Sequence, residues 1–379
     1  MASKITIHGF YGEGNLGDEA ILKALLQEFS KFTHIKVVVF SRNPKRVSIV
    51  HGVKSVHSQG RRSLLRRIWE IKTSDLFILG GGGLLKDYGN DSKSIKRWLG
   101  LLRLTQRLKV KTALYAVGIE NIQYNSSKEL LREALDKVKL ITVRDDSSRD
   151  ILRDIGVMGE VKVTTDPALL FTDTNVREIE DASALSKSPR IMICVRHWFD
   201  KGFYIEKPEA NEHFLRSLGI AADFIVERYQ GNIDFIPMRV TSYDDDRAAA
   251  EQVISYMTHK SSTQIYPLVP DADEFIKMVR QYSLVVGMRL HSLILATVAG
   301  VPVIGLEYMP KVKAYMKSIN QDEYSLALDS ITSDKLISLI EKTFDKRSIR
   351  SKIILSEVCR LQRIAQDNIA ELVELAGGK

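Results

Sequence analysis

An arginine and a histidine lie two residues apart inside the most apolar stretch of the chain. The stretch runs from Val285 to Leu306 (VVGMRLHSLILATVAGVPVIGL), and the two polar side chains are Arg289 and His291. Its glycines and proline predict a strand, a turn and a helix that begins near His291, so both residues fall in the first turn of that helix. A guanidinium, an imidazole and a helix N-terminus together favour an anion such as a phosphate or a carboxylate.

Other cationic residues follow strands that the sequence predicts in the same half of the chain. Arg196 comes after one such strand, and Lys311 comes after another, beyond the acid Glu307. Because ligands collect at the carboxyl ends of parallel strands, we expect these cations to join Arg289 in one pocket. The structural alternatives are a buried salt bridge from Arg289 to an acid such as Glu307 and a helix N-cap role for His291.

Two glycine-rich segments follow strands in the first half. One is GFYGEGNLGDEAIL, which begins at Gly9, and the other is the tetraglycine Gly80–Gly83 in LGGGGLLKD, expected to join a strand to a helix. Glycine permits positive φ angles and close approach of a ligand or another backbone, so both are candidate binding loops. The first also fits G-x-G-x-x-G by spacing, with Arg42 rather than an acid after the next strand, which leaves NADP binding or a tight turn as alternatives. For the second segment the alternative is a crowded domain interface.

Short β-branched runs alternate with helical patterns along the chain, which predicts βαβ units and parallel sheets. The expected strands are Lys4–Gly9, Ile35–Phe40, Asp75–Leu79, Thr112–Val117, Leu140–Val143 and Val161–Val163, then Arg190–Val195, Asn232–Pro237, Gln264–Pro267, Leu284–Val286 and Val301–Leu306. A helix is expected over Glu19–Phe29 with Asp18 as its N-cap, and a last amphipathic helix over Asp345–Leu375.

The polar segment Asp173–Pro189 interrupts this alternation and is typical of a linker. A chain of 379 residues also suits two domains rather than one. We therefore expect two doubly wound, Rossmann-like α/β domains facing a cleft, over residues 1–175 and 188–350. The final helix, residues 350–379, is expected to pack across both.

Composition bounds the class of protein. The chain is 44% hydrophobic and 27% charged, as in soluble globular proteins, and its start lacks the apolar segment of a signal peptide. Its two cysteines, Cys194 and Cys359, provide neither a disulfide framework nor a zinc or redox pair. A cytoplasmic location is the expectation.

No metal or other cofactor is expected. The acids Asp18, Asp87, Asp145 and Asp166 follow separate strands without the spacing of metal ligands. The sequence carries no signal of oligomeric state.

The formal charge of +8 is concentrated in two segments, Arg61–Arg67 and Lys93–Lys111. A solvated face is the simple interpretation, and an anionic membrane surface or an anionic substrate is the functional one. Nucleic acid is not expected as a partner, because no base-stacking aromatic motif accompanies the positive charge.

Six segments together resemble the polysaccharide pyruvyl transferase family. They are GFYGEGNLGDEAIL, ILGGGGLLKD, VRDDSSRDIL, TDPALL, GMRLHSLILA and GVPVIGLEYMPKVKAYM, in this order from about Ile5 to Met316. The chain is most similar to the bacterial members that pyruvylate a secondary cell-wall polymer anchoring S-layer proteins.

The resemblance implies a GT-B-like glycosyltransferase architecture and transfer of pyruvate from phosphoenolpyruvate to a sugar as a 4,6-cyclic ketal, with release of phosphate. It also implies an acceptor, the β-linked N-acetylmannosamine of a lipid-linked precursor at the inner face of the cell membrane. Peripheral contact with that membrane through the basic segments is a further expectation.

By the same resemblance, the phosphoenolpyruvate site maps onto Arg196, Arg289, Leu290, His291 and Lys311. Our hypothesis is that His291 is the acid–base group or a phosphate donor and that the cations bind the anionic ends of the donor. The acceptor is expected to contact Glu13, Asn15, Asp18, Gly82 and Gly83. Family members often carry Asp where this chain has Met309.

Two other functions remain open at the level of sequence. One is a nucleotide-sugar glycosyltransferase or epimerase on the same scaffold, with Glu307 binding the ribose. The other is a non-enzymatic, membrane-associated binding protein that uses its arginines.

Overall fold

The structure is a computed structural model that describes residues 2–87, 92–171, 188–198, 208–242 and 244–377. Its contacts divide the chain into two units. Unit 1 comprises Met1–Glu13, Asp18–Phe171 and Leu361–Lys379, and unit 2 comprises Gly14–Gly17 and Thr172–Arg360. All but the last two residues of the expected linker Asp173–Pro189 lie outside the described residues.

Unit 1 contains a seven-stranded, fully parallel sheet in the order β3-β2-β1-β4-β5-β6-β7. Its strands are β1 (Ser3–His8), β2 (Ile35–Ser41), β3 (Lys54–His57), β4 (Leu76–Lys86), β5 (Lys111–Glu120), β6 (Leu140–Val143) and β7 (Val161–Val163). Every strand expected in this half is present. The short edge strand β3 was not predicted, because KSVH has one apolar residue and no alternating pattern.

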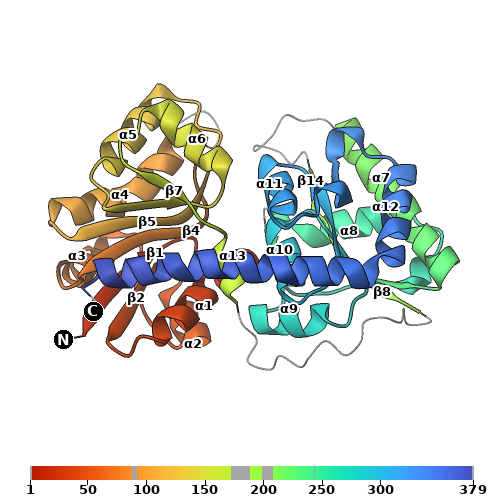
Figure 1. Cartoon of the computed structure of the whole chain (residues 1–379), viewed down its shortest axis with the longest axis horizontal. Coiled ribbons are helices and arrows are strands. Elements are labelled where there is room, and N and C mark those ends of the chain that lie inside the picture. The colour runs from red at the N-terminus through yellow and green to blue at the C-terminus, as the bar shows by residue number, and fades with distance from the viewer. Residues whose placement is uncertain (1, 88–91, 172–187, 199–207, 243, 378–379) are drawn as a thin grey trace. The chain divides into compact units, whose positions relative to one another are not determined.

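Helices cover both faces of this sheet. They are α1 (Leu16–Ser30), α2 (Pro44–His51), α3 (Leu64–Lys72), α4 (Lys93–Arg107), α5 (Asn125–Leu135) and α6 (Asp146–Ile155). Figure 1 shows α1 and α2 on one face and α4 and α5 on the other. Apolar residues of β4, β5 and α4, such as Leu79, Leu114 and Leu102, form the core beneath α4 and α5.

Two local predictions in unit 1 are wrong. Helix α1 begins at Leu16, so Asp18 lies in its first turn, and the N-cap is Asn15, whose Oδ1 accepts the Gly17 amide at 3.0 Å. Gly80–Gly83 does not join a strand to a helix, because these glycines lie inside β4. The strand bulges there: Gly81 and Gly82 have φ of 79° and 82°, and the pairing with β5 shifts register beyond Gly82.

Unit 2 contains a six-stranded, fully parallel sheet in the order β12-β9-β8-β13-β14-β15. Its strands are β8 (Arg190–Cys194), β9 (Asn232–Phe235), β12 (Thr263–Ile265), β13 (Leu284–Gly287), β14 (Val303–Glu307) and β15 (Ser325–Ala327), with a small antiparallel pair β10 (Val240–Thr241) and β11 (Asp244–Asp245). The two parallel sheets confirm the doubly wound α/β fold class. The strands β10, β11 and β15 were not predicted, since the first two have only two residues each and β15 (SLA) has no β-branched residue.

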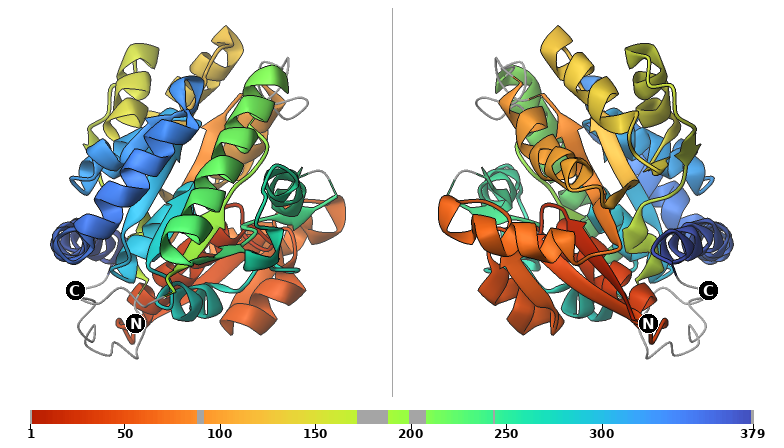
Figure 2. Two further views of the ribbon diagram at one scale, coloured as in Figure 1. Left: turned by 90° about the vertical axis from the view of Figure 1, so that its right-hand side faces the viewer. Right: turned by 90° about the vertical axis from the view of Figure 1, so that its left-hand side faces the viewer.

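The helices of unit 2 are α7 (Pro208–Tyr229), α8 (Asp246–Ser255), α9 (Ala272–Val279), α10 (Leu290–Val298), α11 (Pro310–Ser318), α12 (Ser333–Asp345) and α13 (Arg347–Leu375). Those from α7 to α11 lie between strands of unit 2, and α12 and α13 follow its last strand, β15. Helices α7 and α12 pack side by side (Figure 2). Among the described residues, no helix is long and apolar enough to cross a bilayer.

Helix α13 contributes to both units. Residues up to Arg360 group with unit 2, where the buried Arg350 donates to the carbonyl of Val303 at 2.6 Å and stacks on the Tyr324 ring at 3.4 Å. Residues from Leu361 onward group with unit 1, where Gln362 donates to the Leu169 carbonyl at 2.8 Å.

Candidate functional site

In the six-stranded sheet, the direction in which successive strands are added reverses between β8 and β13. From β8 it proceeds to β9 and β12 on one side, and from β13 to β14 and β15 on the other. Arg196 follows β8 and Arg289 follows β13. The carboxyl ends of parallel strands at such a switch point are the usual place for a ligand.

Arg289 is held by two carboxylates that sequence analysis did not select. Its Nη2 lies 2.5 Å from Asp246 Oδ1 and 2.9 Å from Asp244 Oδ1. Burial lowers the pKa of the Arg289 guanidinium, but the charges of the two acids raise it by more, so the group stays charged. The alternative expected for Arg289, a buried salt bridge to an acid, is confirmed, but its partners are Asp244 and Asp246. Glu307, the acid named as an example, instead accepts a hydrogen bond from Ser325.

Asp244 is shared by three arginines. Its Oδ1 lies 2.9 Å from Arg289 Nη2 and 3.6 Å from Arg196 Nη2, and its Oδ2 lies 3.4 Å from Arg239 Nη1. Burial raises the pKa of the Asp244 carboxyl, but Arg289 and Arg196 outweigh it and hold that pKa below its ordinary value. Three guanidiniums therefore surround Asp244 and its neighbour Asp246, which leaves an excess of positive charge.

Backbone amides hold the carboxylate of Asp246 in place. It is the first residue of α8, and its Oδ2 accepts the amides of Met238 and Arg239 at 3.0 and 3.1 Å. Its side chain is 2% exposed. A carboxylate so anchored sets the direction in which the Arg289 guanidinium points.

His291 lies in the first turn of α10, which begins at Leu290 as the sequence predicts to within one residue. Gly17 approaches it so closely that an added Cβ would lie 2.0 Å from His291 Nδ1. The neighbouring Leu16 donates its amide to the Met238 carbonyl at 3.3 Å, and Asn15 forms an antiparallel bridge with Arg239. Close packing, rather than a turn alone, requires glycine at position 17.

Lys311 and Leu290 complete the set predicted for the donor. Lys311 lies in the first turn of α11, with its Nζ 5.5 Å from the centroid of the Tyr308 ring. Tyr308 is also a neighbour of Arg289 and raises the pKa of its guanidinium. Leu290 is 5% exposed. Tyr308 was not selected from the sequence, although it directly follows Glu307 at the end of β14.

The residues predicted for the acceptor separate into two groups. Asp18 and Gly82 lie together in unit 1, since a Cβ added at Gly82 would be 2.8 Å from Asp18 Oδ1. Gly83 is next to Gly82 in β4.

The other two predicted acceptor residues have partners elsewhere. Glu13 pairs with Arg42 at 3.1 Å. Asn15 groups with unit 2, and its side chain caps α1.

A buried ion cluster at the strand ends of unit 1 was also missed. Arg144 follows β6 and lies 3.3 Å from Asp166, 3.6 Å from Asp145 and 3.7 Å from Glu120. A Cβ added at Gly118 would be 2.5 Å from Arg144 Nη2. The available signal was position, because Arg144 directly follows β6 and Asp166 comes three residues after the end of β7.

Neither unit gathers a conventional metal-ligand set in the part of the chain that the structure describes. No group of three or more His, Cys, Asp or Glu side chains is suitably placed there.

A model of the polysaccharide pyruvyl transferase family matches residues 15–309. No curated protein matches the chain. Among solved structures, a glycosyltransferase from Rickettsia africae aligns at 11% identity with a TM-score of 0.63, covering 98% of each chain. The UDP-GlcNAc 2-epimerase of Neisseria meningitidis bound to UDP-GlcNAc aligns at 11% identity and 0.59, covering 98% of this chain and 100% of that one. The UDP-GlcNAc 2-epimerase of Methanocaldococcus jannaschii aligns at 13% identity with a TM-score of 0.59, covering 89% of this chain and 92% of that one. At these identities the likeness shows the GT-B fold alone.

Proposed function

The chain belongs to the polysaccharide pyruvyl transferase family, and we propose that it transfers pyruvate from phosphoenolpyruvate to a sugar as a 4,6-cyclic ketal. We further propose that the sugar is the β-N-acetylmannosamine of a lipid-linked cell-wall precursor of the S-layer type. This finer assignment is supported by the six sequence segments described above.

The observation that carries the proposal is the cationic strand edge of unit 2. Arg196, Arg239 and Arg289 share the single carboxylate of Asp244. Phosphoenolpyruvate carries a carboxylate and a phosphate, and guanidinium groups bind both in a bidentate manner. In this proposal the anionic groups of the donor bind the arginines, either beside Asp244 or in its place. Lys311 adds a further positive charge.

The chemistry then needs two hydroxyl attacks at C2, one protonation at C3 and the departure of phosphate. A sugar hydroxyl attacks C2 of the enol phosphate and loses its proton to a base, while C3 receives a proton and becomes a methyl group. The C2–O bond to phosphate breaks next, and the second hydroxyl closes the ketal at C2 with loss of its own proton. Positive charge stabilises the departing phosphate, and a titratable group serves the proton transfers.

His291 is the group that we assign to proton transfer or to the phosphate. His291 lies in the first turn of α10, directly after Leu290 and two residues after Arg289. The imidazole is therefore close in sequence to the guanidinium that we assign to the donor. Gly17 packs against the ring, and this contact restricts the orientations open to the imidazole. A fixed ring is what proton transfer along a defined direction requires.

For the acceptor we retain Asp18, Gly82 and Gly83 as a group, with Glu13 and Asn15 as neighbours in the sequence. A carboxylate accepts hydrogen bonds from sugar hydroxyls, and glycine leaves room for a ring beside it. The pairing of Glu13 with Arg42 and the capping role of Asn15 make Asp18 the stronger candidate.

We also propose that the reaction uses no metal and no organic cofactor, because the donor itself supplies the activated enol and the leaving group. The enzyme would act in the cytoplasm at the inner face of the membrane, where its acceptor is presented. Phosphate release that persists in EDTA would agree with the first of these proposals.

The decisive test supplies phosphoenolpyruvate with a panel of synthetic lipid-linked disaccharides and follows both phosphate release and product mass. The expected product gains one pyruvyl ketal on N-acetylmannosamine and on no other sugar of the panel. Thermal stabilisation by a UDP-sugar but not by phosphoenolpyruvate would overturn the donor assignment in favour of a nucleotide-sugar enzyme.

A further inference from the structure

Helix α3 exposes large apolar side chains on the surface of unit 1. Leu65 is 82% exposed, Trp69 is 57% exposed and Leu64 is 41% exposed. Leu65 and Trp69 are four residues apart, so they lie on one face of the helix. Scattered apolar residues are ordinary on a surface, but a row that includes tryptophan on one helix face calls for a partner.

Positive charge surrounds this row. Arg61, Arg62 and Arg66 are exposed at the start of α3 and in the short 3-10 turn before it. Arg67 is turned inward, where its Nη1 donates to the His57 carbonyl and to Ser63 Oγ at 3.3 and 2.9 Å. The exposed part of this basic segment is thus the part that lies beside the apolar row.

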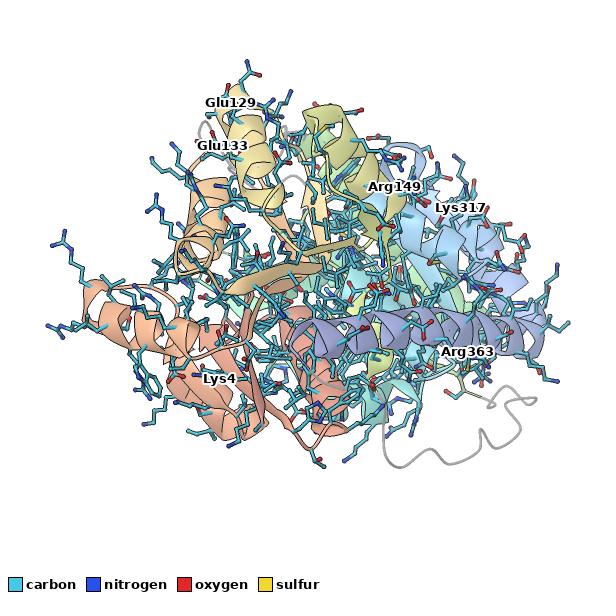
Figure 3. All side chains as sticks on the ribbon, turned by 60° about the vertical axis from the view of Figure 1, so that its left-hand side comes forward. Lys4, Glu129, Glu133, Arg149, Lys317 and Arg363 are labelled. Carbon is cyan, nitrogen blue, oxygen red and sulfur yellow. The ribbon has the colours of Figure 1, made fainter. Side chains whose placement is uncertain are left out.

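The one acid in residues 61–72 does not offset this charge at the surface. Glu70 is 1% exposed, and Lys4 and Lys54 each lie 2.6 Å from its carboxylate. The same two ammonium groups lie 4.9 and 5.3 Å from the Trp69 ring centroid, within the range of a cation–π contact. Lys4 is labelled in Figure 3.

The second basic segment, on α4, is different. Arg103 lies 3.5 Å from Glu133 of α5, and Lys111 donates to the Leu375 carbonyl at 3.0 Å. Glu129 and Glu133 project together from α5 in Figure 3. An acid on α5 therefore offsets Arg103 of α4, whereas the exposed arginines beside the apolar row of α3 have no such acid within their own segment, Arg61–Arg67.

We propose that unit 1 docks on an anionic lipid bilayer through a basic-apolar face formed by Arg61, Arg62, Leu64, Leu65, Arg66 and Trp69. Leucine and tryptophan enter the headgroup region of a bilayer, and flanking arginines bind lipid phosphates. Charge complementarity selects this occupant over a neutral surface. The inference deepens the proposed function by naming the surface at which a lipid-linked acceptor is met, but its test uses neither donor nor acceptor.

The test measures co-sedimentation of the full chain with vesicles of phosphatidylcholine alone and of phosphatidylcholine mixed with phosphatidylglycerol. We expect binding to the mixed vesicles that weakens with salt, and little to the neutral ones. Arg62→Glu/Arg66→Glu should lower the partition coefficient by at least about 30-fold, since each basic residue contributes on the order of 1 kcal/mol near such a surface. Leu65→Ser should lower it without changing its salt dependence.

The matched control is Lys317→Glu/Arg363→Glu, which makes the same change of charge on two exposed residues of α11 and α13 (Figure 3). The control should bind like the unmodified chain, and all variants should keep their melting temperature. Brominated lipid should quench part of the tryptophan fluorescence of the unmodified chain. Trp69→Phe should remove that quenching, although the chain keeps its other two tryptophans.

Equal loss in both double variants would show that net charge alone drives binding and would overturn the assignment of this face. Loss of self-association in Leu65→Ser, with no vesicle binding by the unmodified chain, would assign the face to a second copy instead. Retained vesicle binding without pyruvyl transfer would contradict the proposed function and leave this inference standing.

Discussion

The strand ends of the two sheets carry opposite chemistry on the same architecture. In unit 2, three arginines gather around Asp244 and its neighbour Asp246. In unit 1, one buried arginine, Arg144, lies among three acids, and glycines lie within β4 and near the end of β5.

This difference separates two kinds of ligand. An excess of guanidinium groups favours a small anion with several charges, whereas carboxylates beside glycines favour a neutral ligand rich in hydroxyl groups. A parallel sheet thus supplies only the position, and the residues that follow each strand decide the ligand. The comparison supports our proposal that the donor binds unit 2 and the acceptor binds unit 1, and each of the following variants tests part of that proposal.

The largest effect is expected for His291→Ala. If the imidazole transfers a proton, turnover should fall by about 10²-fold or more while phosphoenolpyruvate binding changes little. Phosphate release under saturating donor measures this. His259→Ala, in which the lost imidazole pairs with the exposed Glu227, is the control of the same residue type. Turnover near that of the control would remove His291 from the mechanism.

The second largest effect is expected for Gly17→Ala, with a loss of turnover of roughly 10- to 100-fold. An added Cβ would lie 2.0 Å from His291 Nδ1, so the ring must move, and small displacements of a catalytic group are costly. Gly100→Ala in α4 is the matched control, because nothing lies within 4 Å of its added Cβ. Unchanged turnover in Gly17→Ala would show that the position of the ring is not critical.

Arg289→Lys and Asp18→Asn should divide the two substrates. Lysine keeps the charge beside Asp246 but loses the planar fork, so the KM for phosphoenolpyruvate should rise by about 10-fold and that for the acceptor should not. Asp18→Asn should raise the acceptor KM alone. Steady-state kinetics with each substrate varied in turn measures both. A rise in the same KM for both variants would break the comparison between the units.

The smallest effect concerns acid stability. Arg289 and Arg196 hold the pKa of Asp244 below its ordinary value in the folded protein, despite the opposing effect of burial. The unfolded chain therefore binds the proton first as pH falls, and the stabilisation by Asp244, present above about pH 4, is lost as pH falls through the lowered pKa.

In Asp244→Asn, the free energy of unfolding should accordingly decrease less steeply on acidification below about pH 4 than in the unmodified chain. Urea unfolding at a series of pH values measures the slope. Parallel curves for the two proteins would mean that Asp244 is not held by the arginines.

The strands and their polar ends followed from the sequence because their signals are local. Apolar runs fix the strands, and Arg196, Arg289 and Lys311 lie at fixed offsets from them. The partners of Arg289 could not be found this way. Asp244 and Asp246 are more than 40 residues away and belong to β11 and α8, whose placement beside β13 depends on the tertiary fold.

The wrong local predictions have a similar origin. Asp18 and Asn15 are both good N-caps, and the choice between them depends on the contact of Leu16 with Met238, which no local pattern encodes. The tetraglycine is equally compatible with a loop and a bulged strand, and its long parallel pairing with β5 selects the strand.

Helix α13 also sets an order of events during synthesis. Ala365, Ile369 and Leu372 are buried, and Lys162 of β7 binds Glu371 at 3.0 Å, all within unit 1. These residues leave the ribosome after all of unit 2 has been translated. Unit 1 therefore cannot complete its fold until the residues of unit 2 have been translated, and part of its apolar surface stays uncovered until then.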